Sequence, residues 1–147
     1  MPDYSSHVPH IISKVRHAIS DYLQKRLEEA GCQGIVPSHG DILSNLFIHG
    51  ELTMTQLAIN IKRDRSTVTT LVKKLERQGM VALIHNPDDM RSKKVVLTEK
   101  GMQFKACFNK ISEDLLGTLW EGVLEEDKEV FIKVLLQIRS NFEDPTA

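Results

Sequence analysis

The chain has 147 residues, of which 41% are apolar and 27% charged, a composition typical of a folded domain with its own hydrophobic core. No apolar run approaches the roughly 18 to 20 residues of a membrane span, and the first residues lack the basic and apolar segments of a secretory signal. We therefore expect a cytoplasmic protein without a membrane partner. Two cysteines, Cys32 and Cys107, are too few for a disulfide framework and lack metal-site spacing.

The formal net charge of −1 conceals an uneven distribution of charge along the chain. Residues 62–100 contain 10 Lys or Arg and 5 Asp or Glu, a net charge of +5, whereas the remainder carries a net charge of −6. Affinity for nucleic acid comes largely from neutralising phosphates. We therefore expect the basic segment, residues 62–100, to contact a polyanion, and the acidic flanking segments to have a different role.

Helices are predicted for the first third of the chain. Apolar residues at helical spacing predict a long helix over about residues 7–30, and Gly31 is a natural end for it. Because its apolar positions begin almost at the first turn, we expect its early part to pack on a distant segment or another subunit. A second helix is predicted over residues 37–50 with Ser38 as the candidate N-cap, and residues 52–53 form a short link.

Two short helices joined by a polar turn are predicted within the basic segment. The first runs from the candidate N-cap Thr55 to Ile61, and residues 62–64 form the turn. The second runs from Arg65 to Gly79, with an apolar stripe at i, i+3, i+4 and i+7 formed by Val68, Leu71, Val72 and Leu75. The opposite face carries hydroxyls and cations: Ser66, Thr69, Thr70, Lys73 and Arg77. This pattern fits a helix-turn-helix whose second helix enters the major groove of DNA.

A β-hairpin with a charged tip is predicted next. Residues 80–84 and 93–97 are compatible with strands, and Asn-Pro-Asp-Asp at residues 86–89 is a strong turn sequence. After a helix-turn-helix, such a hairpin is the wing of a winged helix-turn-helix. Two further helices are predicted over about residues 98–119 and 125–142.

These motifs, in this order and spacing, resemble those of the MarR family of bacterial transcription regulators. The resemblance is carried by Gln56-Leu57-Ala58, Ser66-Thr67-Val68-Thr69, Leu71-Val72, Leu75-Glu76, Gly79, Asp89-Met90-Arg91 and Leu97-Thr98-Glu99-Lys100-Gly101. It implies a mainly α fold with a small β-hairpin wing (α+β). Residues 1–36 would be an N-terminal dimerisation helix, 37–101 the winged helix-turn-helix DNA-binding domain and 102–147 the C-terminal dimerisation helices.

The resemblance also implies a function. We expect a homodimer that binds a pseudo-palindromic operator in double-stranded DNA, acts as a repressor, needs no cofactor and is not an enzyme. In the family, the Asp of the Asp-x-Arg pattern orients the wing and its Arg enters the minor groove, which gives these roles to Asp89 and Arg91. The expected DNA contacts are Arg63, Arg65, Ser66, Thr67, Thr69, Thr70, Lys73, Lys74, Asp89, Arg91 and Lys93, with Ser66, Thr67 and Thr70 at base edges. Many relatives carry Arg at the position of Thr70.

Members of the family often bind small aromatic or anionic effectors in a cleft between the dimerisation helices and the DNA-binding lobe. The residues of this chain that could contribute to such a site are Arg16, His17, Tyr22, His39 and Phe47. An effector would release the protein from DNA by favouring a spacing of the two lobes that mismatches the operator.

Other interpretations stay open at this stage. His10 and His17 share a helix face, but no histidine follows His85, so we expect no metal site. A redox sensor would need an accessible thiolate, yet Cys32 follows a helix end, where the helix dipole does not favour a thiolate. A winged helix used only for protein contacts is the remaining alternative, and the basic segment argues against it.

Overall fold

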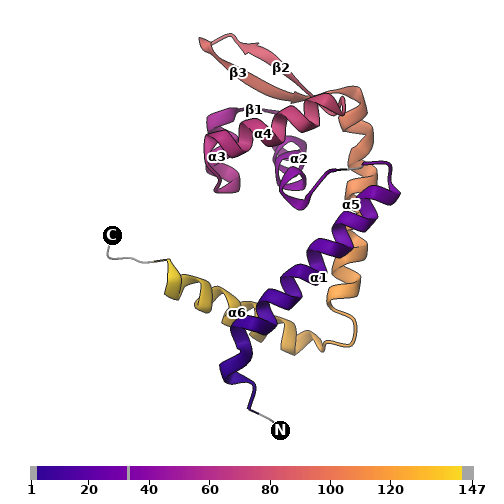
Figure 1. Cartoon of the computed structure of the whole chain (residues 1–147), viewed down its shortest axis with the longest axis vertical. Helices are drawn as coiled ribbons and strands as arrows, with labels where there is room; N and C mark the ends of the chain where they lie inside the picture. The colour runs from indigo at the N-terminus through magenta and orange to yellow at the C-terminus, as the bar shows by residue number, and fades with distance from the viewer. Residues whose placement is uncertain (1–2, 33, 144–147) are drawn as a thin grey trace. The chain divides into compact units, whose positions relative to one another are not determined.

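The computed structural model describes residues 3–32 and 34–143 and has the predicted fold class, mainly α with a small β-hairpin wing. Figure 1 shows the succession of helices and the sheet, with its paired strands β2 and β3 extending beyond the helices around them. The elements are η1 (Ser5–His7), α1 (Val8–Glu29), α2 (Pro37–His49), β1 (Glu51–Thr53), α3 (Met54–Ile61), α4 (Arg65–Arg77), β2 (Val81–Asn86), β3 (Asp89–Leu97), α5 (Glu99–Leu119) and α6 (Glu125–Phe142).

The chain divides into two compact units, Met1–Glu113 and Asp114–Ala147, with the division inside α5. In the first unit the core surrounds α4, whose Val68, Val72 and Leu75 are fully buried while Leu71 is partly buried. Leu57 of α3 and Ile42 of α2 belong to the same core, together with Leu43, Leu46, Val81 and Val95. The apolar stripe predicted for the second helix of the pair is therefore confirmed as its inner face.

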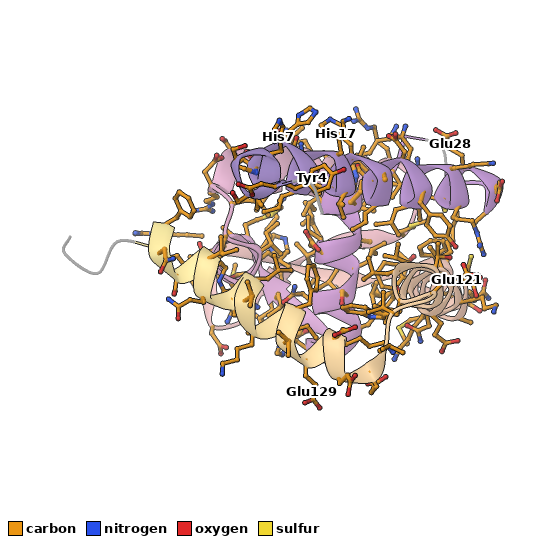
Figure 2. The ribbon with its side chains drawn as sticks, turned by 90° about the horizontal axis from the view of Figure 1, so that it is seen from below. Tyr4, His7, His17, Glu28, Glu121 and Glu129 are labelled. Atoms are coloured by element: carbon orange, nitrogen blue, oxygen red, sulfur yellow. The ribbon has the colours of Figure 1, made fainter. Side chains whose placement is uncertain are left out.

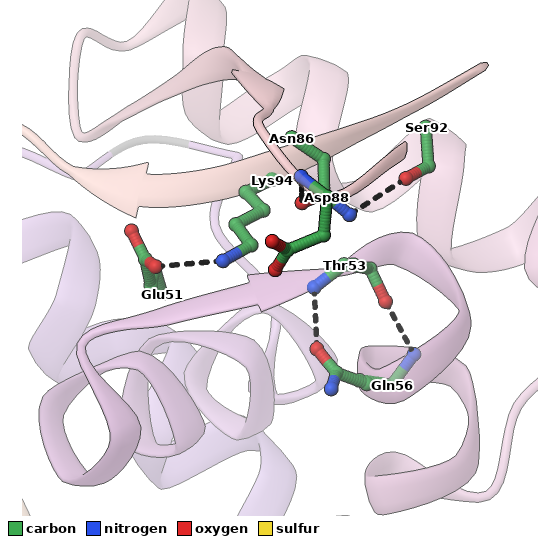
Figure 3. A network of polar contacts seen from close by, with 7 residues as sticks. All are labelled: Glu51, Thr53, Gln56, Asn86, Asp88, Ser92 and Lys94. Carbon is green, nitrogen blue, oxygen red and sulfur yellow. Dashed lines mark hydrogen bonds and ion pairs between the residues drawn. The ribbon is translucent and has the colours of Figure 1, made fainter. Parts of the chain in front are cut away.

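The starts of α2 and α3 differ from the prediction. Helix α3 is capped by Thr53 and not by Thr55: Thr53 Oγ1 accepts a hydrogen bond from the Gln56 N–H at 3.1 Å, and Gln56 Oε1 accepts from the Thr53 N–H at 2.9 Å. Figure 3 shows this reciprocal capping box. Helix α2 begins at Pro37, so Ser38 lies inside the first turn and the N-cap residue is Val36, whose N–H donates to His39 Nδ1 at 2.9 Å.

The predicted link at residues 52–53 is wrong, because these residues belong to a strand. Strand β1 pairs antiparallel with β3, so that Leu52 lies opposite Val95, and the sheet order is β1-β3-β2. Both side chains are buried. At the edge of this pairing Lys94 Nζ lies 2.8 Å from Glu51 Oε1 (Figure 3). Three residues are too few to show a period, and their partner lies more than 40 positions away, so no local pattern indicates this strand.

The remaining elements agree closely with the predictions. Helix α1 ends at Glu29, and Gly31 follows in a left-handed conformation with φ of +83°. The hairpin is longer than predicted, since β2 reaches Asn86 and β3 begins at Asp89. In the described part of the chain, no helix combines the length and apolar character that a membrane span needs.

The helices near the two ends carry many exposed apolar side chains. On α1 these are Val8, Ile11, Ile12 and Val15. Within the second unit, α6 exposes Val130, Phe131, Ile132, Val134 and Leu136, while Trp120 packs edge to face on Phe131 with ring centroids 6.0 Å apart. Contiguous exposed apolar faces of this kind are typical of surfaces that another chain covers.

Candidate nucleic-acid interface

The sequence 54–77 forms the predicted helix-turn-helix. Helix α3 ends at Ile61, and Lys62 takes a left-handed conformation with φ of 54°, which turns the chain towards α4. Helices α3 and α4 pack together, Leu57 and Val68 belong to the same core, and α4 also contacts β2 (Figure 1). This packing fixes how α4 presents its outer face.

The outer face of α4 is polar and positively charged. Arg65, Ser66, Thr70, Lys73 and Arg77 are exposed, whereas Thr67 and Thr69 are half-buried. Arg63, in the turn before the helix, is also exposed. The predicted polar face is thus present, with hydroxyls near its first turns and cations along its length.

Asp64 caps this helix and was predicted only as part of a polar turn. Its Oδ1 accepts hydrogen bonds from Ser66 Oγ at 2.6 Å and from the Thr67 N–H at 2.8 Å, and its Oδ2 accepts from Thr67 Oγ1 at 3.1 Å. These bonds lower the pKa of Asp64 to about 2, and the bond from Ser66 has the largest effect. Asp is among the preferred N-cap residues, and the position of Asp64 directly before the expected helix start at Arg65 would have identified it.

The other two hydroxyls of α4 bond to its backbone. Thr69 Oγ1 donates to the carbonyl oxygen of Arg65 at 2.8 Å, and Thr70 Oγ1 donates to that of Ser66 at 3.1 Å. Such bonds to the preceding turn hold each side chain in one rotamer.

The wing is braced from within by short polar contacts. Asp89 Oδ1 accepts a hydrogen bond from the backbone N–H of Arg91 at 2.9 Å. Asn86 Nδ2 donates to Ser92 Oγ at 2.9 Å (Figure 3). The side chains of Arg91 and Lys93 are exposed. Asp89 therefore bonds to the backbone of the wing, and the Arg91 side chain is exposed to solvent.

Lys74, also among the expected DNA contacts, is less exposed than Arg63, Arg65 and Lys73. Its side chain is half-buried, and its Nζ would lie 2.9 Å from a Cβ atom added to Gly34 in the loop after α1. It also lies near enough to His39 to help lower the pKa of that imidazole, for which burial is the larger cause. One residue further along a helix is a rotation of about 100°, which takes Lys74 off the face that carries Lys73.

Comparison with known proteins identifies this arrangement. The model of the MarR family matches residues 35–93. The uncharacterized HTH-type transcriptional regulator YdgJ of Bacillus subtilis (strain 168) is 30% identical over 110 residues, which cover 75% of this chain and 67% of YdgJ. The chain belongs to the MarR family. It is thus a transcription regulator of the winged helix-turn-helix type and not an enzyme.

Solved structures of MarR-family and similar proteins show the same fold. The S. aureus MepR-DNA complex superposes with a TM-score of 0.83 at 24% identity, covering 91% of this chain and 97% of MepR. Bordetella bronchiseptica BpsR, whose DNA binding is regulated by 6-hydroxynicotinic acid, superposes with a TM-score of 0.75 at 16% identity, covering 90% of this chain and 98% of BpsR.

The residues expected at the effector site of this MarR-family chain have different local surroundings. Arg16 and His17 are exposed on α1, and His17 points away from the helix axis (Figure 2). Tyr22 accepts a hydrogen bond from Arg26 Nη1 at 3.1 Å. His39 is buried beside Val36, and Phe47 packs edge to face on Phe108 with ring centroids 5.4 Å apart.

Two small cavities lie near the junction of α1 and α5 in the described residues. One of about 260 Å³ is lined by Cys32, Met80, Lys100, Phe104 and Cys107 among others, and one of about 250 Å³ by Arg26, Glu29 and Lys110 among others. None of the five expected effector residues lines either cavity. An effector site built from those five residues stays a prediction.

The two thiols are free and share the larger of these cavities. Burial raises the pKa of the Cys32 thiol, nearby Cys107 raises it further, and Lys100 opposes both effects in part. A raised pKa keeps Cys32 in the unreactive thiol form, which disfavours it as a redox sensor. Within residues 3–32 and 34–143, no three His, Cys, Asp or Glu side chains are grouped as a metal site would require.

Proposed function

We propose that this MarR-family regulator binds specific sites in double-stranded DNA as a homodimer and represses transcription until a small aromatic or anionic effector releases it. The observation that carries this proposal is the exposed face of α4, with its hydroxyls and cations, held in one lobe with a wing that exposes Arg91. That MepR forms a complex with DNA supports the same use of the shared fold.

In this proposal each part of the lobe contacts a different part of the duplex. Helix α4 lies in the major groove, where Ser66, Thr67 and Thr70 approach base edges. Arg63, Arg65 and Lys73 are exposed and bind phosphates, a role that the position of Lys74 does not favour. Arg91 reaches the minor groove, where a narrow groove concentrates negative potential, and Lys93 adds a phosphate contact.

The homodimer follows from the apolar surfaces near the two ends of the chain. The exposed Val8, Ile11, Ile12 and Val15 of α1 and the apolar side chains of α6 would be covered by the same surfaces of a second copy. Two-fold symmetry would present two copies of α4 to successive turns of one duplex face, ~34 Å apart. The operator would therefore be a pseudo-palindrome.

Repression and release are the finer parts of the proposal. A dimer that covers a promoter excludes polymerase, which makes repression the simplest outcome of binding. BpsR, whose DNA binding is regulated by 6-hydroxynicotinic acid, supports a small aromatic anion as the class of effector. Such a ligand must bind the DNA-competent and DNA-incompetent states with unequal affinity, since otherwise it shifts nothing.

Selection of bound fragments from genomic DNA tests the proposal. The full-length protein is mixed with sheared DNA at low salt, and the recovered fragments are sequenced. We expect enrichment of a two-fold symmetric site whose neighbouring genes suggest the effector. Recovery of no fragment above background would favour a winged helix used for protein contacts instead.

A further inference from the structure

The hydroxyl groups of α4 are all used as hydrogen-bond donors inside the protein. Ser66 and Thr67 donate to the carboxylate of Asp64, and Thr69 and Thr70 donate to carbonyl oxygens one turn earlier. Carbonyl oxygens can only accept hydrogen bonds. An ionised carboxylate also only accepts, and the lowered pKa of Asp64 keeps it ionised at neutral pH. The direction of all four bonds is therefore fixed by the chemistry of the partners.

A hydroxyl has one hydrogen and two acceptor lone pairs. Once the hydrogen is bonded inside the protein, only lone pairs remain for an outside partner. Ser66 and Thr70 are exposed and lie one helical turn apart on the outer face, whereas Thr67 and Thr69 are half-buried. The hydroxyls that α4 presents to its surroundings therefore act as acceptors, and accepting from outside leaves the internal bonds intact.

We propose that Ser66 and Thr70 read hydrogen-bond donors on the base edges of the bound DNA, namely the amino groups of cytosine N4 and adenine N6. This inference rests on the proposed function and adds to it the class of base that α4 selects. In the major groove, cytosine N4 and adenine N6 are the donors, whereas guanine presents N7 and O6 and thymine presents O4, all acceptors. An acceptor facing an acceptor is unfavourable, so guanine or thymine at these positions would be rejected.

The alternative is that Ser66 or Thr70 turns its hydrogen outward to guanine or thymine. For Ser66 this would break its 2.6 Å bond to Asp64, leaving the serine oxygen beside a negative charge. For Thr70 it would break the 3.1 Å bond to the carbonyl of Ser66. Accepting a hydrogen bond from cytosine or adenine leaves both of these internal bonds intact. Donors for guanine remain available on this face, but they belong to the cations Arg65 and Lys73.

The test begins with selection of a site from a random-sequence duplex pool by the full-length protein. In the selected duplex, each cytosine and adenine is then replaced singly by an analogue that lacks the amino group, 2-pyrimidinone for cytosine and purine for adenine. Affinity is measured for wild type, Ser66→Ala and Thr70→Val, with Thr118→Val as a control that removes an exposed hydroxyl from α5. Thermal unfolding of each variant checks that the fold is kept.

The comparison across variants separates recognition from duplex stability, since loss of an amino group weakens base pairing equally for every protein. We expect at least one amino-group deletion that weakens wild type and Thr118→Val by about fivefold or more and has little further effect on Ser66→Ala or Thr70→Val. Equal losses in all four proteins at every position would overturn the inference while leaving DNA binding intact. Failure to select any duplex would instead count against the proposed function.

Discussion

His39 illustrates how one buried side chain ties the α1–α2 loop to the lobe. The residue is 5% exposed, and its imidazole accepts a hydrogen bond from the backbone N–H of Val36 and lies near the charge of Lys74. Burial is the largest cause that lowers the pKa of His39 below its usual value, and the charge of Lys74 adds to it. The neutral imidazole is thus the form that the folded protein favours.

Because the folded-state pKa of His39 is lowered, the unfolded chain binds more protons as the pH falls through about 6.5, the ordinary value for histidine. The contribution of His39 to stability is therefore complete above that pH and decreases below it. We predict that His39→Gln has a smaller loss of unfolding free energy between pH 7.5 and pH 5 than wild type. Urea unfolding at both pH values measures this, and equal losses would contradict it.

Arg91 is the residue on which the proposed role of the wing depends. Its side chain is exposed while its N–H is held by Asp89, so truncation should remove the minor-groove contact without disturbing the hairpin. We predict that Arg91→Ala weakens binding to the selected operator by about tenfold at moderate salt. The exposed Lys25 of α1 offers a control with the same change of charge. If Lys25→Ala weakens binding as much as Arg91→Ala, the loss reflects overall charge and the wing assignment fails.

At the level of elements, α5 contains two glycines in contrasting surroundings. A Cβ atom at Gly101 would lie 2.1 Å from the carbonyl oxygen of Met80, whereas one at Gly117 would meet nothing within 4 Å. Met80 lies between α4 and β2, so this close approach holds α5 against the segment that joins them. Gly101 is therefore required for the packing of α5 on Met80. No packing contact within the described part of the chain requires a glycine at position 117.

We predict opposite effects on stability for alanine at these two positions. Gly101→Ala must push backbone apart and should lower the unfolding free energy by about 1–3 kcal/mol or more. Gly117→Ala should raise it by roughly 0.5–1 kcal/mol, since alanine is the better helix former. Chemical denaturation of both variants measures the difference, and a neutral Gly101→Ala would show that α5 approaches Met80 less closely.

The accuracy of the sequence predictions depended on the range of the contacts involved. Helix α4 was predictable because Val68, Val72 and Leu75 are three or four positions apart and share one core. Strand β1 was not, since Leu52 becomes a strand residue only through its pairing with Val95. The cap of α3 was placed two residues too late, although Thr53 is followed three residues on by Gln56, which is the sequence signature of a capping box, whereas Thr55 is followed by Ala58.

The candidate site was predicted in outline, and the orientation of individual side chains was not. The exposed face with Ser66, Thr70 and Lys73 follows from helical periodicity alone. The loop after α1 brings Gly34 close to Lys74 and helps to bury His39. No local sequence pattern specifies the path of this loop. The N-cap role of Asp64 could have been predicted from the sequence, whereas its hydrogen bond with the Ser66 hydroxyl could be found only in the structure.

For the molecule as a whole, the exposed apolar residues of α1 and α6 predict an assembly of two chains. We expect sedimentation equilibrium to give twice the chain mass of 16.7 kDa. Val15→Asp places a charge within the exposed apolar face of α1 and should shift the protein towards monomer. Lys14→Asp, at the exposed neighbouring position, is the control and should remain a dimer. A wild-type protein that sediments as a monomer would contradict the proposed dimer.

The proposed function depends on binding of the phosphates and bases of duplex DNA by α3, α4 and the wing. The affinity of the full-length protein for its selected duplex, measured across a range of salt concentrations, tests this binding. We predict a steep linear fall of log affinity with log salt, because each lysine or arginine that neutralises a phosphate releases a counterion. Lys73→Ala should reduce the slope by about one. Absence of binding at low salt, or an affinity indifferent to salt, would contradict the claim.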